Sequence, residues 1–228
     1  MGLFMKKDQP YQQEFRLLLR SKKEIIHPDH QLKDLEYIVF DTETTGFHPY
    51  AGDEIISIGA VKITAGEITE TFHTYINPLR PVPPEIQTLT GITDQRLEDQ
   101  PLLLEGLYEF LQFAYQSYLI AHSADFDLHF LNIALKKNLG LKIKHPIIDT
   151  MNIAYHLHPR WDSHSLDLLL QYYQIPIMDR HDALGDAKMT AKLFHCLLKK
   201  LEERGITTVG ALKRNMPSVC RQAPYLKY

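Results

Sequence analysis

Hydrophobic and polar positions along the chain follow two different periods. Three apolar segments, residues 37–43, 54–64 and 67–78, are rich in β-branched side chains and are separated by short connections. Short connections join antiparallel neighbours, so these segments predict a three-strand antiparallel meander. Two shorter apolar segments, residues 118–122 and 146–150, predict further strands in the second half of the chain.

Helical spacing dominates the rest of the second half. Leu128, Leu131 and Leu135 repeat at intervals of three and four residues, as on one face of a helix. Similar patterns predict helices over residues 102–114, 125–138, 163–175 and 182–204, and another that begins at residue 151. A meander followed by alternating helices and strands predicts an α/β fold, with a central mixed five-stranded sheet flanked by helices.

The predicted elements divide the chain into a core domain and two extensions. The core domain spans residues 36–204 and holds all five predicted strands. Residues 1–35 predict an N-terminal appendage with a short amphipathic helix at residues 11–21. That helix either docks on a partner protein or packs on its own domain, and the sequence leaves both open. Residues 205–228 predict a basic C-terminal tail.

Composition favours an ordinary globular protein in a reducing compartment. Hydrophobic residues make up 44% of the chain and the net charge is -3. No apolar run approaches the ~20 residues that cross a bilayer, and the first residues do not have the pattern of a signal peptide. The two cysteines, Cys196 and Cys220, have no metal-type spacing. We therefore expect a cytoplasmic protein without a membrane partner.

Candidate chemistry begins where the first strand ends, in YIVFDTETTGF. Asp41 and Glu43 are two residues apart, so both carboxylates project from the same face of the strand, ~7 Å apart. A charge at the end of a buried strand must be compensated. The question raised by this stretch is what compensates these two acids.

Two later segments supply further acids and histidines. Asp127 follows His122 and Asp125 where a predicted strand passes into a helix, and we expect Asp125 to cap that helix. His181 and Asp186 are five residues apart, about 140° from each other on a single helix. We therefore expect His181 in the loop before the last long helix and Asp186 in its first turns.

Several carboxylates that converge on one point repel each other unless cations lie between them. Mg²⁺ and Mn²⁺ prefer carboxylate and water ligands. Two such ions ~3.5–4 Å apart can bind the attacking and leaving oxygens of a phosphodiester, and a nearby histidine can accept the proton of the attacking water. We interpret His122 as structural.

The three segments FDTETTGF, AHSADFDLHFL and HDALGDAKMTA together resemble the exonuclease motifs of the DEDDh family. This ribonuclease H-like group includes the proofreading (epsilon) subunit of bacterial DNA polymerase III. The resemblance covers roughly residues 36–201 and implies a ribonuclease H-like fold. It also implies catalysis with two divalent metal ions, Mg²⁺ or Mn²⁺.

The resemblance implies a role for each matched residue of the centre. It implies that His181 is the general base and that four acids bind the metal ions. Those acids are Asp41, Glu43, Asp127 and Asp186. The histidine of this chain lies five residues before the last aspartate. The other branch of the family has a tyrosine four residues before that aspartate, so the resemblance is to the histidine branch.

Contacts with the substrate follow from the same resemblance. It implies that the backbone near Thr44, the side chain of Phe126 and His181 lie at the terminal nucleotide. Glu85 matches a position that contacts the 3′ end in proofreading subunits. Thr90 belongs to LTGIT, which resembles the base-contacting loop of the family.

Two residues depart from the family pattern. Ser123 stands where an asparagine usually follows the motif histidine, which puts the hydrogen bonds of that turn in question. Thr90 stands where the proofreading subunit has a histidine, so the nucleotide contacts there are expected to differ. Neither position is one of the metal-binding acids.

The function expected from this resemblance is 3′→5′ exonuclease activity on DNA, in proofreading or repair, with release of nucleoside 5′-monophosphates. The expected partner is a single-stranded or frayed DNA 3′ end. Three alternatives stay open: an exoribonuclease of the same mechanism, an inactive nucleic-acid-binding module, and a subunit that docks on a DNA polymerase. Digestion of matched DNA and RNA distinguishes the first two from the expected activity.

A histidine-rich segment, HLHPRWDSH, offers a different chemistry. His156, His158 and His164 are common zinc ligands, but cysteine or acidic partners at ligand spacing are missing. A surface loop is the interpretation that the sequence favours here.

Overall fold

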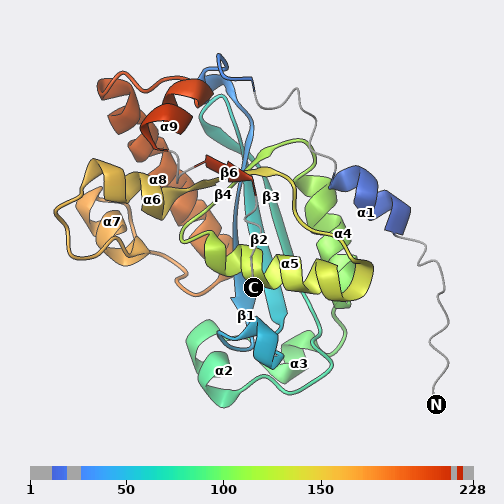
Figure 1. Cartoon of the computed structure of the whole chain (residues 1–228). Helices are drawn as coiled ribbons and strands as arrows, with labels where there is room; N and C mark the ends of the chain where they lie inside the picture. Colours follow the sequence, from blue (N-terminus) through green and yellow to red (C-terminus); the bar gives the residue numbers. More distant parts are fainter. Residues whose placement is uncertain (1–11, 20–26, 217–219, 223–228) are drawn as a thin grey trace.

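The computed structural model describes residues 12–19, 27–216 and 220–222, and within them one mixed sheet forms the centre of the molecule (Figure 1). Its strands lie in the order β3-β2-β1-β4-β5-β6. They are β1 Tyr37–Thr44, β2 Ile55–Thr64, β3 Glu67–Tyr75, β4 Tyr118–Ala121, β5 Pro146–Asp149 and β6 Cys220–Gln222. β1, β2 and β3 are antiparallel, and β4 and β5 continue the sheet in parallel with β1. The predicted five-stranded mixed sheet is confirmed, and the short β6 extends it beside β5.

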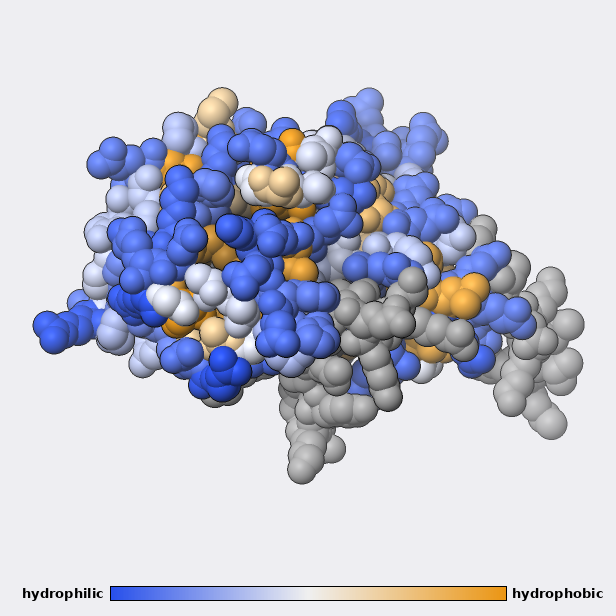
Figure 2. Space-filling model, turned by 90° about the horizontal axis from the view of Figure 1, so that it is seen from above, coloured by the Kyte–Doolittle hydropathy of each residue, from blue (hydrophilic) through white to orange (hydrophobic). Residues whose placement is uncertain are grey.

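Helices surround this sheet, and none that the structure describes is long and apolar enough to cross a membrane. They are α1 Gln12–Leu18, α2 Pro84–Thr90, α3 Asp94–Leu97, α4 Leu103–Phe113, α5 Asp125–Leu139, α6 Thr150–Leu157, α7 Leu166–Tyr172, α8 Ala183–Glu203 and α9 Val209–Asn215. The predicted helix over residues 163–175 is shorter than expected, because the segment before Ser165 is irregular. Seen from above, the surface is mostly hydrophilic, with hydrophobic residues in small separate groups (Figure 2).

Successive side chains of β1 point to opposite faces of the sheet and enter two different cores. Tyr37 and Val39 are buried with residues of α6, α7, α8 and α9. Ile38 and Phe40 are buried on the other face with residues of α1, α4 and α5. Asp41 and Glu43 continue the alternation of Tyr37 and Val39, so their side chains belong to the face that α8 covers.

Two elements that the sequence placed outside the core domain pack on it. Phe15 of α1 is fully buried, and its ring lies against Tyr108 of α4 with the ring centroids 5.6 Å apart. This is the second of the two arrangements left open for that helix, packing on its own domain. In α9, Leu212 is buried in the core on the α8 face. The predicted appendage and tail therefore both contribute apolar residues to the cores.

The position of α8 depends on a close approach to the sheet at Gly59. This glycine pairs with Asp41 across β1 and β2. A Cβ atom at Gly59 would collide with the backbone of Ala183 and Leu184, which form the first turn of α8. The missing side chain lets the start of α8 rest directly on β2, beside the end of β1.

We expect Gly59→Ala to lower the free energy of unfolding by about 1–3 kcal/mol, because the added methyl group overpacks a backbone contact that cannot relax easily. Urea unfolding monitored by circular dichroism measures this change. The matched control is Thr71→Ala on the exposed part of β3, which should change stability by less than about 0.5 kcal/mol. Equal stability of Gly59→Ala and wild type would show that the close approach does not constrain α8.

Candidate active site

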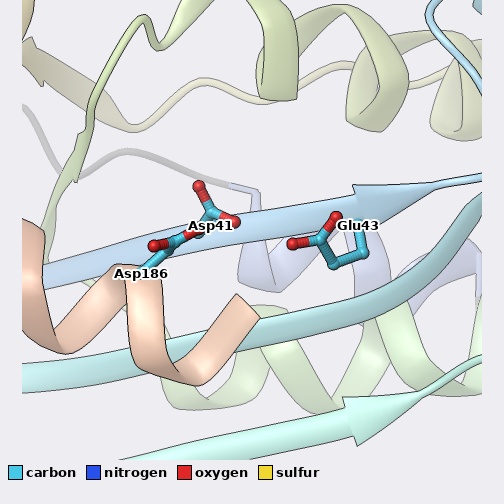
Figure 3. A group of neighbouring side chains, drawn as sticks. All are labelled: Asp41, Glu43 and Asp186. Carbon is cyan, nitrogen blue, oxygen red and sulfur yellow. The ribbon is translucent and has the colours of Figure 1, made fainter. Parts of the chain in front are cut away.

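Three carboxylates meet at the end of β1. Asp41 and Glu43 project from β1, and Asp186 projects toward them from the first turn of α8 (Figure 3). One carboxylate oxygen of each residue lies within 4.8 Å of those of the other two. The arrangement expected from the sequence is therefore observed for these three acids, and Asp186 sits in the first turn of its helix as expected.

Asp127 reaches the same place from the opposite face of the sheet. It lies in the first turn of α5, is almost fully buried, and accepts hydrogen bonds from the Thr42 backbone N at 3.0 Å and from the Thr42 Oγ1 at 2.6 Å. Asp127 is not one of the three acids whose carboxylate oxygens lie within 4.8 Å of one another. Its charge nevertheless raises the pKa of Asp41. The hydrogen bonds to Thr42, which the sequence did not predict, hold Asp127 beside the centre.

The electrostatics of the cluster reflect crowding of like charges in a buried place. Burial raises the pKa of Asp41 well above its ordinary value, and the charges of Asp127, Asp186 and Glu43 raise it further. Burial, followed by the charges of Asp186 and Asp127, raises the pKa of Glu43 to about 8. Burial also raises the pKa of Asp127, to about 7, although its hydrogen bonds to Thr42 oppose the shift. Burial and like charges thus both disfavour the charged forms of these acids, and positive charge at the centre would offset this effect.

Arg180 supplies part of that charge, and the sequence reasoning missed it. Its Nη1 donates a short hydrogen bond to the Asp186 Oδ2, and its Nε donates to the Asp167 Oδ1 at 2.6 Å. The guanidinium lowers the pKa of both Asp41 and Glu43. The available signal was a basic residue directly before the motif histidine, in an otherwise acidic part of the chain.

The remaining oxygens fit a hard divalent cation. Asp186 Oδ1 is buried and has no hydrogen-bond partner among the described residues. An unpaired buried carboxylate oxygen is costly, and a bound cation would satisfy it. A donor set made only of carboxylates is typical of magnesium and manganese sites, not of zinc sites. The cluster therefore implies the use of divalent metal.

The two motif histidines differ sharply in their surroundings. His122 is held by both ring nitrogens, through a 2.9 Å hydrogen bond with Thr150 Oγ1 and a 3.0 Å hydrogen bond with the carbonyl oxygen of His164. Burial lowers the pKa of His122 to about 4. A ring that is neutral and bonded on both sides fits the structural role that we expected for it.

His181 lies in the loop before α8, where the sequence placed it. Its φ of 61° is in the left-handed region, and its backbone N donates to Asp186 Oδ2 at 3.1 Å. The residue is only partly buried, whereas burial raises the pKa of Asp186 beside it. The backbone hydrogen bond ties the position of His181 to the acid beside it.

The turn that precedes Asp127 contains Ser123, one of the two departures from the family pattern. Ser123 has a φ of 61°, a conformation in which asparagine is favoured over serine, and its backbone N donates to Asp149 Oδ1 at 3.1 Å. Asp149 also caps α6, because its Oδ1 accepts a hydrogen bond from Met151 N at 2.9 Å. The expectation that Asp125 caps α5 is wrong: the helix begins at Asp125, after Ala124, and that cap has no side-chain hydrogen bond.

An aromatic hollow lies between the segment that follows β1 and the first turns of α5. The ring of Phe126 lies 5.1 Å from that of Phe130 and 6.1 Å from that of Phe47, measured between centroids. These rings line a hollow of about 390 Å³. Phe47 is 66% exposed and was not singled out in the sequence. The hydroxyl of the buried Thr44, which directly follows Glu43, donates to the Gly46 carbonyl oxygen at 2.6 Å.

Glu85 and Thr90 lie on α2, which Figure 1 shows near the end of the sheet toward which β1 points. Glu85 is exposed in the first turn of that helix. Thr90 is its last residue, and its hydroxyl donates to the Ile86 carbonyl oxygen at 2.8 Å and accepts from Ile92 N at 3.1 Å. The Thr90 hydroxyl is thus engaged in ending the helix, and its role toward a nucleotide stays a prediction.

The mixed sheet and the carboxylate cluster define the class of protein as a nuclease of the ribonuclease H-like type. The family described as Exonuclease (RNase_T) matches residues 38–194, and the chain belongs to this family. It is 41% identical over 177 residues to the DNA polymerase III PolC-type protein of Caldanaerobacter subterraneus subsp. tengcongensis, which covers 78% of this chain and 12% of that protein. It is also 41% identical to a DNA polymerase III subunit epsilon-like protein of Rhodobacter capsulatus, over 79% of this chain and 26% of that protein.

The chain thus spans about an eighth to a quarter of the length of these relatives. Solved structures show the same fold at lower identity. The nuclease domain of 3′hExo, a DEDDh family member bound to rAMP, has a TM-score of 0.66 at 20% identity and covers 75% of this chain and 94% of that one. Exonuclease X in complex with 5′ overhanging duplex DNA has a TM-score of 0.60 at 23% identity, over 78% of this chain and 99% of that one.

We expect the stability of the metal-free protein to fall as the pH rises from about 4.5 to about 8. Over this interval Glu43 keeps its proton when folded but loses it when unfolded, since folding raises its pKa from 4.5 to about 8. The unfolded state then binds fewer protons, so a higher pH favours unfolding, by at most about 1.4 kcal/mol per pH unit for one group. Thermal unfolding in EDTA across this range measures the effect.

Glu43→Gln should reduce this pH dependence, and saturating Mg²⁺ or Ca²⁺ should raise the stability of the wild type most at high pH. The exposed Glu67→Gln on β3 is the control and should keep the wild-type profile. A wild-type Tm that rises steadily from pH 5 to 8 in EDTA would contradict the raised pKa of the cluster.

Proposed function

We propose that this protein is a metal-dependent 3′→5′ exonuclease that removes nucleoside 5′-monophosphates from DNA. The observation that carries the proposal is the meeting of Asp41, Glu43 and Asp186 within 4.8 Å, with His181 beside them. An all-carboxylate centre with an adjacent histidine, whose ring makes no hydrogen bond within the described part of the chain, is suited to hydrolysis of a phosphodiester. The preference for DNA is supported by the names of the related DNA polymerase III proteins.

Each residue of the centre has a distinct task in the proposed reaction. Asp41, Glu43, Asp127 and Asp186 hold divalent cations. When bound, these cations offset charge on the reacting phosphate and orient the attacking water. His181, which must be neutral to act, accepts a proton from that water as its oxygen bonds to phosphorus. The bond from phosphorus to the 3′ oxygen of the preceding nucleotide breaks, and that oxygen takes up a proton to become the new 3′ hydroxyl group.

The terminal nucleotide has a place beside the acids. Phe126 and Phe47 border the aromatic hollow and offer apolar surface to a sugar or base. We propose that this hollow holds the 3′-terminal nucleotide, with the backbone near Thr44 at its edge. Glu85 and Thr90 on α2 approach the same end of the sheet and are proposed as further contacts.

A polymerase partner is a separate hypothesis. The matching relatives are DNA polymerase III proteins by name, and this chain spans only part of their length. A 3′→5′ exonuclease that worked with a polymerase would remove mismatched ends faster than matched ends. A digestion assay therefore compares matched with mismatched 3′ ends, on DNA and on RNA. The strands are labelled at the 5′ end, so that products shortened from the 3′ end are recognised.

We expect hydrolysis of the DNA substrate to stop in EDTA and to return with Mg²⁺ or Mn²⁺. Asp41→Asn and Asp186→Asn should each lower kcat about a thousandfold or more, because each removes charge that holds the cations. Both variants should stay folded, since removing charge from this cluster relieves repulsion. Asp99→Asn, on the exposed surface, is the control and should keep full activity. Faster cleavage of RNA than of DNA would overturn the assigned substrate, and full activity after chelation would overturn the mechanism.

We expect His181→Ala to lower kcat by about 10²–10⁴-fold, because it removes the group that accepts a proton from the attacking water. His122→Ala should instead lower the free energy of unfolding, because it leaves Thr150 Oγ1 and the His164 carbonyl oxygen without their partner. The kcat and the urea unfolding of both variants distinguish these roles. A loss of kcat in folded His122→Ala with full activity in His181→Ala would show that the base had been assigned to the wrong histidine.

A further inference from the structure

A group of aromatic rings gathers on α6, α7 and the segment that joins them. Trp161 stacks on His158 with ring centroids 4.0 Å apart and an interplanar angle of 15°. The ring of His164 lies nearly parallel to that of Trp161, with the centroids 6.1 Å apart and an interplanar angle of 22°. The edges of this stack are covered by Tyr172, at 4.7 Å from Trp161, and by Tyr155, at 5.3 Å from His164. We call these five residues the aromatic row.

The aromatic row lies at the surface and does not form part of the inner core. Tyr155 and Tyr172 are 56% and 55% exposed, and the other three rings are partly exposed. Trp161 also packs against the edge of the core on the α8 face, and His158 is held by a 2.8 Å hydrogen bond with Tyr173. The rings are therefore fixed in position while their outer parts face solvent.

One end of the aromatic row is attached to the candidate active site at two points. The carbonyl oxygen of His164 accepts a hydrogen bond from His122, in the segment that leads to Asp127. The next helix, α7, begins beside it, and Asp167 in its first turn binds Arg180, which in turn binds Asp186. From there the row extends along α6 and α7, which lie side by side next to α8 in Figure 1.

Cationic side chains accompany the aromatic row. Arg160 is exposed in the segment between His158 and Trp161. Arg204 donates to the carbonyl oxygens of His156 and Leu157, at the end of α6, at 3.2 and 2.8 Å. Both Arg204 and Lys200 lie close enough to lower the pKa of His158, after the larger effect of its burial. Lys200 is paired with Glu203, so Arg160 and Arg204 are the cations better placed for a ligand.

We propose that the aromatic row is a binding subsite for single-stranded nucleic acid upstream of the cleaved nucleotide. Exposed aromatic rings interleaved with cations are the features with which proteins hold single strands without reading their sequence, since every base has a face that can stack. The strand would stack its bases on the exposed rings and place its phosphates near Arg160 and Arg204. The proposal rests on the proposed function, because the 3′ end must lie at the acid cluster for the row to be upstream of it.

Trp161 is the single tryptophan of the chain, so its fluorescence reports directly on the aromatic row. The probes are oligothymidylates of about 12 and about three nucleotides, titrated into the full-length protein in EDTA, where the proposed hydrolysis is blocked. We expect the longer strand to quench Trp161 and to bind at least about tenfold more tightly than the shorter one. Binding of the longer strand without any change in Trp161 fluorescence would overturn the proposal.

Variants show whether the rings themselves bind the strand. Tyr172→Ala and Trp161→Ala should each weaken binding of the longer strand by about tenfold, as measured by anisotropy of a labelled strand, while Trp161→Phe should retain most of the affinity. Tyr115→Ala is the control, since Tyr115 is 45% exposed just beyond the end of α4, on the other face of the sheet. Circular dichroism checks the fold of Trp161→Ala, and Tyr172→Ala keeps the test valid if that variant unfolds.

The two proposals fail in distinguishable ways. If the protein hydrolyses no nucleic acid but the longer strand still quenches Trp161, the proposed function fails and the row is a binding site of another kind of nucleic-acid protein. If hydrolysis proceeds and the row variants bind long and short strands as the wild type does, only the subsite fails. Unchanged binding in both Tyr172→Ala and Trp161→Ala would return the row to a packing role.

Discussion

The direct contact between the first turn of α8 and β2 is the constraint on which the candidate active site depends. Gly59 leaves room for the backbone of Ala183 and Leu184, and the same glycine is the β2 partner of Asp41. A side chain at this position would hold the helix away from the sheet, so the close approach made possible by the glycine brings Asp186 within reach of β1. The acid cluster is a consequence of this packing.

Asp127 is brought to the same place by a different interaction. Because side chains alternate along β1, Asp41 and Glu43 face α8 while Thr42 faces α5. Thr42 donates two hydrogen bonds to Asp127, which fixes the start of α5 at the end of the strand. Three consecutive residues of β1 thus face the two layers of helices, and the charges come together where the two cores end.

Concentrating these acids is electrostatically unfavourable without cations. Burial and mutual repulsion raise the pKa of Asp41, Glu43 and Asp127, and Arg180 offsets only part of the negative charge. Arg180 is itself bound to Asp167 of α7, so the charge balance of the centre extends to the helix that carries part of the aromatic row. The same ion pair that stabilises the acids therefore orients the surface that we propose as the path of the strand.

The sequence by itself determined the meander, the alternation of later strands and helices, and the positions of the acids and His181, because these depend on local periodicity and on motif spacing. Only the tertiary structure decided which groups meet. Folding alone brings Thr42 to Asp127 and α8 to Gly59, because these residues are far apart in the sequence. Irregular turns, which have no periodic pattern, set the contact of Arg180 with Asp186 and the stacking of Trp161 on His158. The edge strand β6 escaped prediction for the same reason, since a three-residue strand is defined by its partner β5 and not by its own sequence.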